Sequence, residues 1–253
     1  MESRARDSDH REPMTPSISQ EQALPGPLTL SQVTIGKKVV MAVTGAIWFG
    51  YVIGHLLGNL QIYADPERIN DYAAFLHRTL PLLWGTRIVL LIALVAHIAA
   101  SIQLTLRNLD ARPVPYARKD DIVTTYAART MVYSGPILLL FIAYHLAHLT
   151  VGMTPGYAFD THNVYNNVIF GFRIWWLSML YIAAQAALGL HLYHGLWSAL
   201  QTVGANHPKY NAWRKRFATI VAAAVVAGYI SIPISVMAGI LQPTKTVSAP
   251  TAH

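Results

Sequence analysis

The chain has 253 residues, of which 53% are hydrophobic and 12% are charged, and its mean hydropathy is +0.35. Soluble proteins carry about 25% charged residues, so this composition argues against a soluble enzyme, and the high apolar content and absence of Cys exclude a disordered chain and a disulfide scaffold. The net charge of +7 points to a membrane surface, and we expect no nucleic-acid partner.

The order of polar and apolar segments predicts one membrane domain between two tails. Residues 1–33, rich in Ser, Pro, Glu and Arg, predict a mobile cytoplasmic tail without a secretory signal peptide. Residues 34–241 contain five windows free of Asp, Glu, Lys and Arg, and a membrane-spanning helix needs roughly 20 apolar residues. The windows predict transmembrane helices at about 39–63, 86–107, 130–154, 172–203 and 216–241. Residues 242–253 predict a disordered tail, and the acidic segment around Glu67 and Asp71 a solvated loop.

The distribution of basic residues predicts the orientation of these helices. Fourteen of the 19 Lys and Arg residues precede helix one or lie between helices two and three or helices four and five. Cytoplasmic loops of membrane proteins carry an excess of these residues. We therefore predict a cytoplasmic N-terminus and a C-terminus on the outside.

Imidazole side chains are the informative feature of the spans. Six histidines stand in otherwise uncharged segments: His55, His97, His145, His148, His191 and His194. Ionisable groups at this depth are expensive and mark functional sites. Without Cys, the site best matched is one that uses neutral imidazole alone, and bis-histidine haem iron is the commonest of these in a helical bundle. The predicted fold is thus an all-α membrane protein of five transmembrane helices, the first four forming a cofactor-binding four-helix bundle.

The helical rise of about 1.5 Å per residue predicts two layers of histidines. It places His55 and His145 about 24 and 22 Å from the cytoplasmic ends of their helices. His97 and His191 lie about 14 and 18 Å from those ends. The outer layer joins helices one and three, and the inner layer joins helices two and four, which are diagonal partners in an up-down bundle.

Two further histidines leave this assignment open. His148 and His194 stand three residues beyond His145 and His191, on the same faces of regular α-helices. Depth along the helix alone does not decide whether His145 or His148, or whether His191 or His194, is the ligand.

Three segments carry a family resemblance. They read GHLLGNLQ at 54–61, YHLAH at 144–148, and HLYHGLWSALQT at 191–202, which continues into GANHPK at 204–209. They resemble the single-chain cytochrome b subunit of succinate dehydrogenase and fumarate reductase, the b558 type. The resemblance covers roughly residues 35–241, and its most specific part is the segment that runs from His191 through Gly195-Leu-Trp-Ser.

The resemblance implies a membrane subunit of succinate:quinone oxidoreductase in the bacterial inner membrane. Its partners are a flavoprotein and an iron–sulfur subunit on the cytoplasmic side, and a higher oligomer of the whole complex is left open. Its cofactors are two haems b and a quinone, either menaquinone or ubiquinone. The implied axial pairs are His97 with His191 and His55 with His145, with His148 and His194 as alternates.

Other residues are candidates for contacts with these groups. Arg129 could pair with a haem propionate, and small residues that let a flat macrocycle approach the backbone are Gly58, Gly189 and Gly195. Close helix packing explains these glycines as well. Polar and aromatic residues near the cytoplasmic ends of helices three and four are candidates for a quinone site: Tyr133, Ser134, Trp197 and Ser198.

Alternative functions remain at this stage. The physiological direction could be fumarate reduction, because cofactor potentials depend on surroundings that sequence does not reveal. A two-iron, two-sulfur cluster of Rieske character could take two His from this chain and two Cys from a partner. A transporter that relays protons through intramembrane His, and a structural anchor without redox role, both predict that no iron is bound.

Overall fold

The computed structural model describes residues 34–110, 126–153, 156–202, 204 and 207–244, which are helical with short connections and contain no strand. The predicted tail at 1–33 and residues 245–253 lie outside the described part of the chain. So does most of the basic loop between the second and third spans.

Five of the helices are long and apolar enough to cross a membrane, so the prediction of five such helices is confirmed. They are α1 (Thr34–Leu60), α3 (Leu80–Asp110), α4 (Tyr126–Leu146), α6 (Trp175–Thr202) and α7 (Pro208–Met237). A 3₁₀ turn, Gln61–Tyr63, extends α1, and a π-helical turn, Ala147–Val151, extends α4.

The ends of all five helices differ from the predicted bounds, and the starts of α6 and α7 have identifiable local causes. Helix α6 begins at Trp175 instead of residue 172, because Ile174 is extended and separates it from a preceding helix. Helix α7 begins at Pro208, eight residues before its predicted start, and the His207 side chain accepts a hydrogen bond from the backbone N–H of Lys209 there. A charge-free window cannot detect this start, because the first turns of α7 carry basic residues that a helix end outside the hydrocarbon tolerates.

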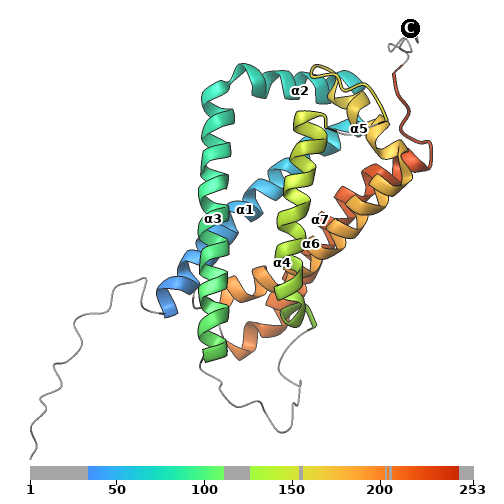
Figure 1. The fold of residues 1–253 in the computed structure, drawn as a ribbon. Helices are drawn as coiled ribbons and strands as arrows, with labels where there is room; N and C mark the ends of the chain where they lie inside the picture. The colour runs from blue at the N-terminus through green and yellow to red at the C-terminus, as the bar shows by residue number, and fades with distance from the viewer. Residues whose placement is uncertain (1–33, 111–125, 154–155, 203, 205–206, 245–253) are drawn as a thin grey trace, which may run out of the picture.

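Two short helices occupy the connections on one side of the long ones. Helix α2 (Pro66–Arg78) has Asp65 as its N-cap and Pro66 in its first turn, and α5 (Val164–Arg173) has Asn163 as its N-cap. Both are standard helix-start signals. The segment with Glu67 and Asp71 is therefore a helix rather than the predicted loop. Figure 1 shows α2 and α5 together at one end of the long helices.

The first residues of the predicted C-terminal tail are held in place. Tyr165 donates to the carbonyl of Gln242 at 2.9 Å, and Arg173 donates to the side-chain amide oxygen of Gln242 at 2.6 Å. Asn166 and Thr244 exchange two further bonds at 2.9 and 3.0 Å. Residues 242–244 thus pack on α5, and the disorder predicted from residue 242 does not begin there.

The long helices pack in a chain of neighbours. Helix α3 packs on α1, α1 on α6, and α6 on α4, while α7 packs along α6 and also contacts α1. In the described part of the chain, no comparable contact joins α1 to α4 or α3 to α6. The backbones in those two combinations stay apart, so side chains alone meet between them.

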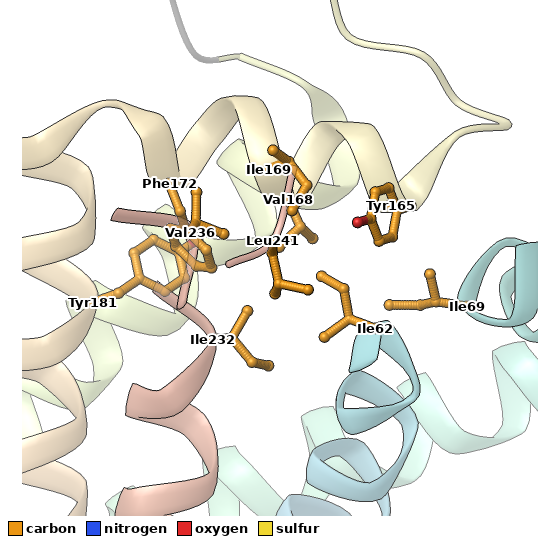
Figure 2. Close-up of a cluster of buried hydrophobic side chains, with 10 residues drawn as sticks. All are labelled: Ile62, Ile69, Tyr165, Val168, Ile169, Phe172, Tyr181, Ile232, Val236 and Leu241. Carbon is orange, nitrogen blue, oxygen red and sulfur yellow. The ribbon is translucent and has the colours of Figure 1, made fainter. Parts of the chain in front are cut away.

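The main buried cluster lies at the α2–α5 end. Figure 2 shows Ile62, Ile69, Tyr165 and Ile169 beside residues of α6, α7 and the C-terminal segment, including Tyr181 and Leu241. Elsewhere the long helices expose large apolar side chains; Leu91 and Ile92 on α3 are 62% and 64% exposed. A second buried cluster joins α1, α6 and α7 through Leu56, Leu192, Ala222 and Val225. The outward sides of the long helices present the apolar surface that lipid requires.

Candidate functional site

The first pair of facing histidines, which we call the inner pair, consists of His97 on α3 and His191 on α6. Their ring centroids are 6.2 Å apart, with an angle of 51° between the ring planes. Nδ1 of His97 lies 3.0 Å from the hydroxyl of Thr44 on α1, and Nδ1 of His191 lies 3.3 Å from the hydroxyl of Ser134 on α4. Four helices thus meet at one pair of rings.

Hydrogen-bond geometry at Thr44 is consistent with one tautomer of His97. The Thr44 hydroxyl lies 2.7 Å from the Val40 carbonyl and 3.2 Å from the Met41 carbonyl, and when it donates to either, its oxygen accepts from His97. The hydrogen of His97 is then on Nδ1, and Nε2 keeps its lone pair. A neutral imidazole in this state is a metal ligand oriented by a hydrogen bond on its other nitrogen.

The second pair, which we call the outer pair, consists of His55 on α1 and His145 on α4. Their ring centroids are 5.7 Å apart, and the ring planes are nearly perpendicular at 85°. Nδ1 of His145 lies 3.3 Å from the hydroxyl of Tyr181 on α6, and the ring of His55 stacks on Tyr51 at 5.4 Å. Tyr229 of α7 packs 6.2 Å from the His55 ring.

The ring separations are those of ordinary ring contacts and are also compatible with a shared metal ion. Each centroid lies roughly 1.1 Å from its nitrogens and metal–nitrogen bonds are about 2.0–2.1 Å, so a metal midway between two imidazoles puts the centroids roughly 6 Å apart. Both pairs bridge helices whose backbones are not in close contact, α3 with α6 and α1 with α4. This combination of facing imidazoles and separated backbones suits a flat macrocycle.

His148 lies in the π-helical turn next to His145, and the Nδ1 atoms of both rings lie within 3.3 Å of the Tyr181 hydroxyl. In the described structure the His148 ring contacts Tyr144, Tyr157 and Tyr181 rather than a histidine of another helix. His148 is 1% exposed, and its Nδ1 lies 2.8 Å from the Tyr181 hydroxyl. Its Nε2 faces Gly171 of α5, where an added Cβ would lie 2.7 Å away.

The ring of His194 makes no ring contact with His97 in the described structure, where His97 contacts His191. The His194 ring packs on Trp197 with a centroid distance of 6.3 Å. Within the described residues, its Nδ1 is buried without a hydrogen-bond partner. The structure therefore brings His191, and not His194, to His97.

The three candidate glycines are in different surroundings. A Cβ at Gly58 would lie 2.8 Å from the Tyr72 ring of α2, and one at Gly189 would lie 2.7 Å from Val226 of α7. These two glycines permit close packing within the protein, so a macrocycle is not needed to explain them. No described side chain lies within 4 Å of the position that a Cβ would take at Gly195, as is also the case at Gly85.

The candidate quinone residues do not form one cluster. Tyr133 is 70% exposed, whereas its neighbour Ser134 is 3% exposed and contacts His191. The Trp197 ring has the Lys215 ammonium 5.5 Å from its centroid, and the Ser198 carbonyl accepts a hydrogen bond from Thr202. Ser134 is thus a partner of the inner pair.

Arg129, with an exposed side chain, lies on the first turn of α4.

Sequence reasoning did not single out Thr44 or Tyr181, the residues that contact His97 and His145. The available signal was weak: each is a hydroxyl-bearing residue within an apolar segment. Such residues in membrane helices usually hydrogen-bond within or between helices. Only the packing of α1 on α3 and of α6 on α4 reveals which imidazole each one meets.

The described residues contain no group of three or more His, Cys, Asp and Glu side chains placed to hold a metal ion. Iron in a porphyrin needs only two axial ligands from protein, and each pair supplies two. Comparison with models of protein families, with curated proteins and with solved structures finds no match for this chain.

Proposed function

We propose that this chain is the membrane-anchoring cytochrome b subunit of a succinate:quinone oxidoreductase and holds two haems b. The observation that carries the proposal is the presence of two facing His pairs, one between α3 and α6 and one between α1 and α4, with ring centroids 6.2 and 5.7 Å apart. The motif resemblance at 54–61, 144–148 and 191–202 supports the choice of family.

In this proposal α1, α3, α4 and α6 form a four-helix bundle around the cofactors. His97 and His191 bind one iron and His55 and His145 the other, and bound haem supplies one-electron transfer. Thr44 and Ser134 orient the inner ligands, and the open space beside Gly195 accommodates part of a macrocycle. Arg129 pairs with a propionate near the cytoplasmic end.

The rest of the complex follows from the predicted orientation. The excess of basic residues on one side supports a cytoplasmic N-terminus and a C-terminus outside, and the family resemblance implies the bacterial inner membrane. The flavoprotein and iron–sulfur subunits dock on the cytoplasmic face, and menaquinone or ubiquinone accepts the electrons. Succinate oxidation is the proposed direction, with fumarate reduction as its reverse.

A Rieske-type cluster shared with a partner is the second candidate, and the inner pair is the place to test it. Two imidazoles on one tetrahedral iron put their ring centroids roughly 5 Å apart, whereas ligands on opposite sides of an iron put them roughly 6 Å apart. The observed 6.2 Å favours opposite ligands and therefore haem.

The deciding experiment is a reduced-minus-oxidised optical spectrum of the purified complex with pyridine haemochrome quantification. We expect two haems b per chain, loss of one in His191→Ala and loss of the other in His145→Ala. His194→Ala and His148→Ala are the matched controls, since these rings do not face a pair, and both should keep two haems. An EPR signal of a His-ligated cluster without haem would favour the shared cluster, and absence of iron would overturn the redox function.

A further inference from the structure

The hydroxyl of Tyr181 connects His145, a proposed haem ligand, with His148, which is not proposed as a ligand. Tyr181 of α6 is 6% exposed, and its hydroxyl lies 3.3 Å from Nδ1 of His145 and 2.8 Å from Nδ1 of His148. The Tyr181 ring is fixed by edge contacts with Phe141 and Phe172, at centroid distances of 5.0 and 4.9 Å. The hydroxyl is thus held between two imidazoles.

The position of the hydrogen on His145 determines which group donates in each of the two hydrogen bonds at the Tyr181 hydroxyl. When Nε2 of His145 faces a metal, its hydrogen is on Nδ1 and is donated to the Tyr181 oxygen. The Tyr181 hydroxyl hydrogen is then free to be donated to Nδ1 of His148. His148 must in turn carry its own hydrogen on Nε2.

The far side of His148 lies beside the Tyr157 ring, at a centroid distance of 6.2 Å. Within the described residues, His148 Nε2 and the Tyr157 hydroxyl are both buried without a hydrogen-bond partner. Both atoms lie close to Gly171: a Cβ added there would be 2.7 Å from Nε2 of His148 and 3.6 Å from the Tyr157 hydroxyl. Burial raises the pKa of Tyr157 to about 12, so the phenol keeps its proton. Because residue 171 is a glycine, no side chain at that position displaces the His148 ring.

From this geometry we propose that Tyr181 is a positioning residue of the outer centre, held by His148 and setting the tautomer and electron donation of His145. The inference rests on the proposed haem-binding function and deepens it. An axial imidazole whose Nδ1–H is hydrogen-bonded is a more basic ligand and stabilises oxidised iron. Removing the acceptor therefore raises the midpoint potential of the outer haem.

The test is a redox titration of both haems in the intact complex carrying Tyr181→Phe. Two haems are retained, and the ratio of reduced to oxidised outer haem at a fixed potential rises about tenfold, which is about 59 mV for a one-electron couple. The inner haem is unchanged. Tyr144→Phe is the matched control, because Tyr144 packs 6.4 Å from the Tyr181 ring and makes no hydrogen bond to either histidine in the described structure.

A second variant covers a failure of Tyr181→Phe to assemble. His148→Phe keeps a ring in the same space but removes the acceptor of the Tyr181 hydroxyl, and it shifts the outer potential upward by a smaller factor. An unchanged outer potential, or equal shifts of both haems, overturns the inference while leaving the two-haem function standing. A wild-type complex without haem overturns both.

Discussion

Around the inner pair, the hydroxyls of Thr44 and Ser134 meet the two imidazoles, and the Thr44 hydroxyl hydrogen ends on a carbonyl of its own helix. Around the outer pair, the hydroxyl of Tyr181 connects His145 to His148, which lies against α5. The contacts of the inner pair therefore involve only nearby hydroxyl and carbonyl groups, whereas the contact of the outer pair with Tyr181 continues to the ring of His148. The same ligand type acquires different surroundings at the two levels.

The strongest way to disturb only the outer level is Gly171→Ala. Its new Cβ would lie 2.7 Å from His148 Nε2, so the His148 ring must move and release the Tyr181 hydroxyl. Overpacking of this kind costs about 1–3 kcal/mol. We expect a lower thermal unfolding midpoint and an altered outer haem with an unaltered inner haem, measured by melting and redox titration.

Gly85→Ala is the control for that change, because no atom lies within 4 Å of the position of its Cβ. It should leave both the melting temperature and the two haem potentials close to wild type. An outer haem that is insensitive to Gly171→Ala would show that His148 is not coupled to the outer pair.

A subtler change separates the inner level from the outer one. Thr44→Val preserves the shape of the side chain and removes the hydroxyl that meets His97. Loss of such a supporting hydrogen bond typically weakens metal binding 10–100-fold, so we expect about tenfold faster loss of the inner haem in a haem-transfer assay.

Thr202→Val is the matched control, since the Thr202 hydroxyl also bonds the carbonyl four residues earlier, at 3.1 Å, in a helix that carries a ligand. Retention of the inner haem in Thr44→Val at the wild-type rate would contradict the assignment of Thr44 as an orienting residue.

The smallest expected effect concerns Tyr157 beyond His148 and appears only in alkali. Below about pH 10 the phenol is protonated in both folded and unfolded chains, so its ionisation does not change stability. Above that pH the unfolded chain loses the proton while the folded protein retains it up to about pH 12, and stability falls. Thermal melting between these pH values should decline less steeply in Tyr157→Phe.

Tyr210→Phe, with a ring 53% exposed on α7, should keep the wild-type alkaline profile. Equal profiles for wild type and Tyr157→Phe would place the Tyr157 hydroxyl in contact with solvent and remove it from the buried group around His148.

The two short helices show where sequence reasoning failed and why. The cap residues Asp65 and Asn163 were visible, but a search for long charge-free windows does not register a helix of 13 or 10 residues. The hydrogen bonds of Gln242 and Thr244 were also missed, because a short polar segment is ordered only by the surface on which it packs. These elements depend on contacts between residues about 80 to 100 positions apart, such as Asn70 with Tyr165.

Local composition by itself determined the five apolar helices and the presence of histidines within four of them, because hydropathy and helical rise act along a single segment. Tertiary structure decided which imidazoles face each other. His148 contacts Tyr181 instead of a histidine of another helix, and the ring of His194 packs on Trp197. It also decided the hydroxyl partner of each ligand, since hydrogen bonds between helices depend on rotation and depth at the contact, which no single segment contains.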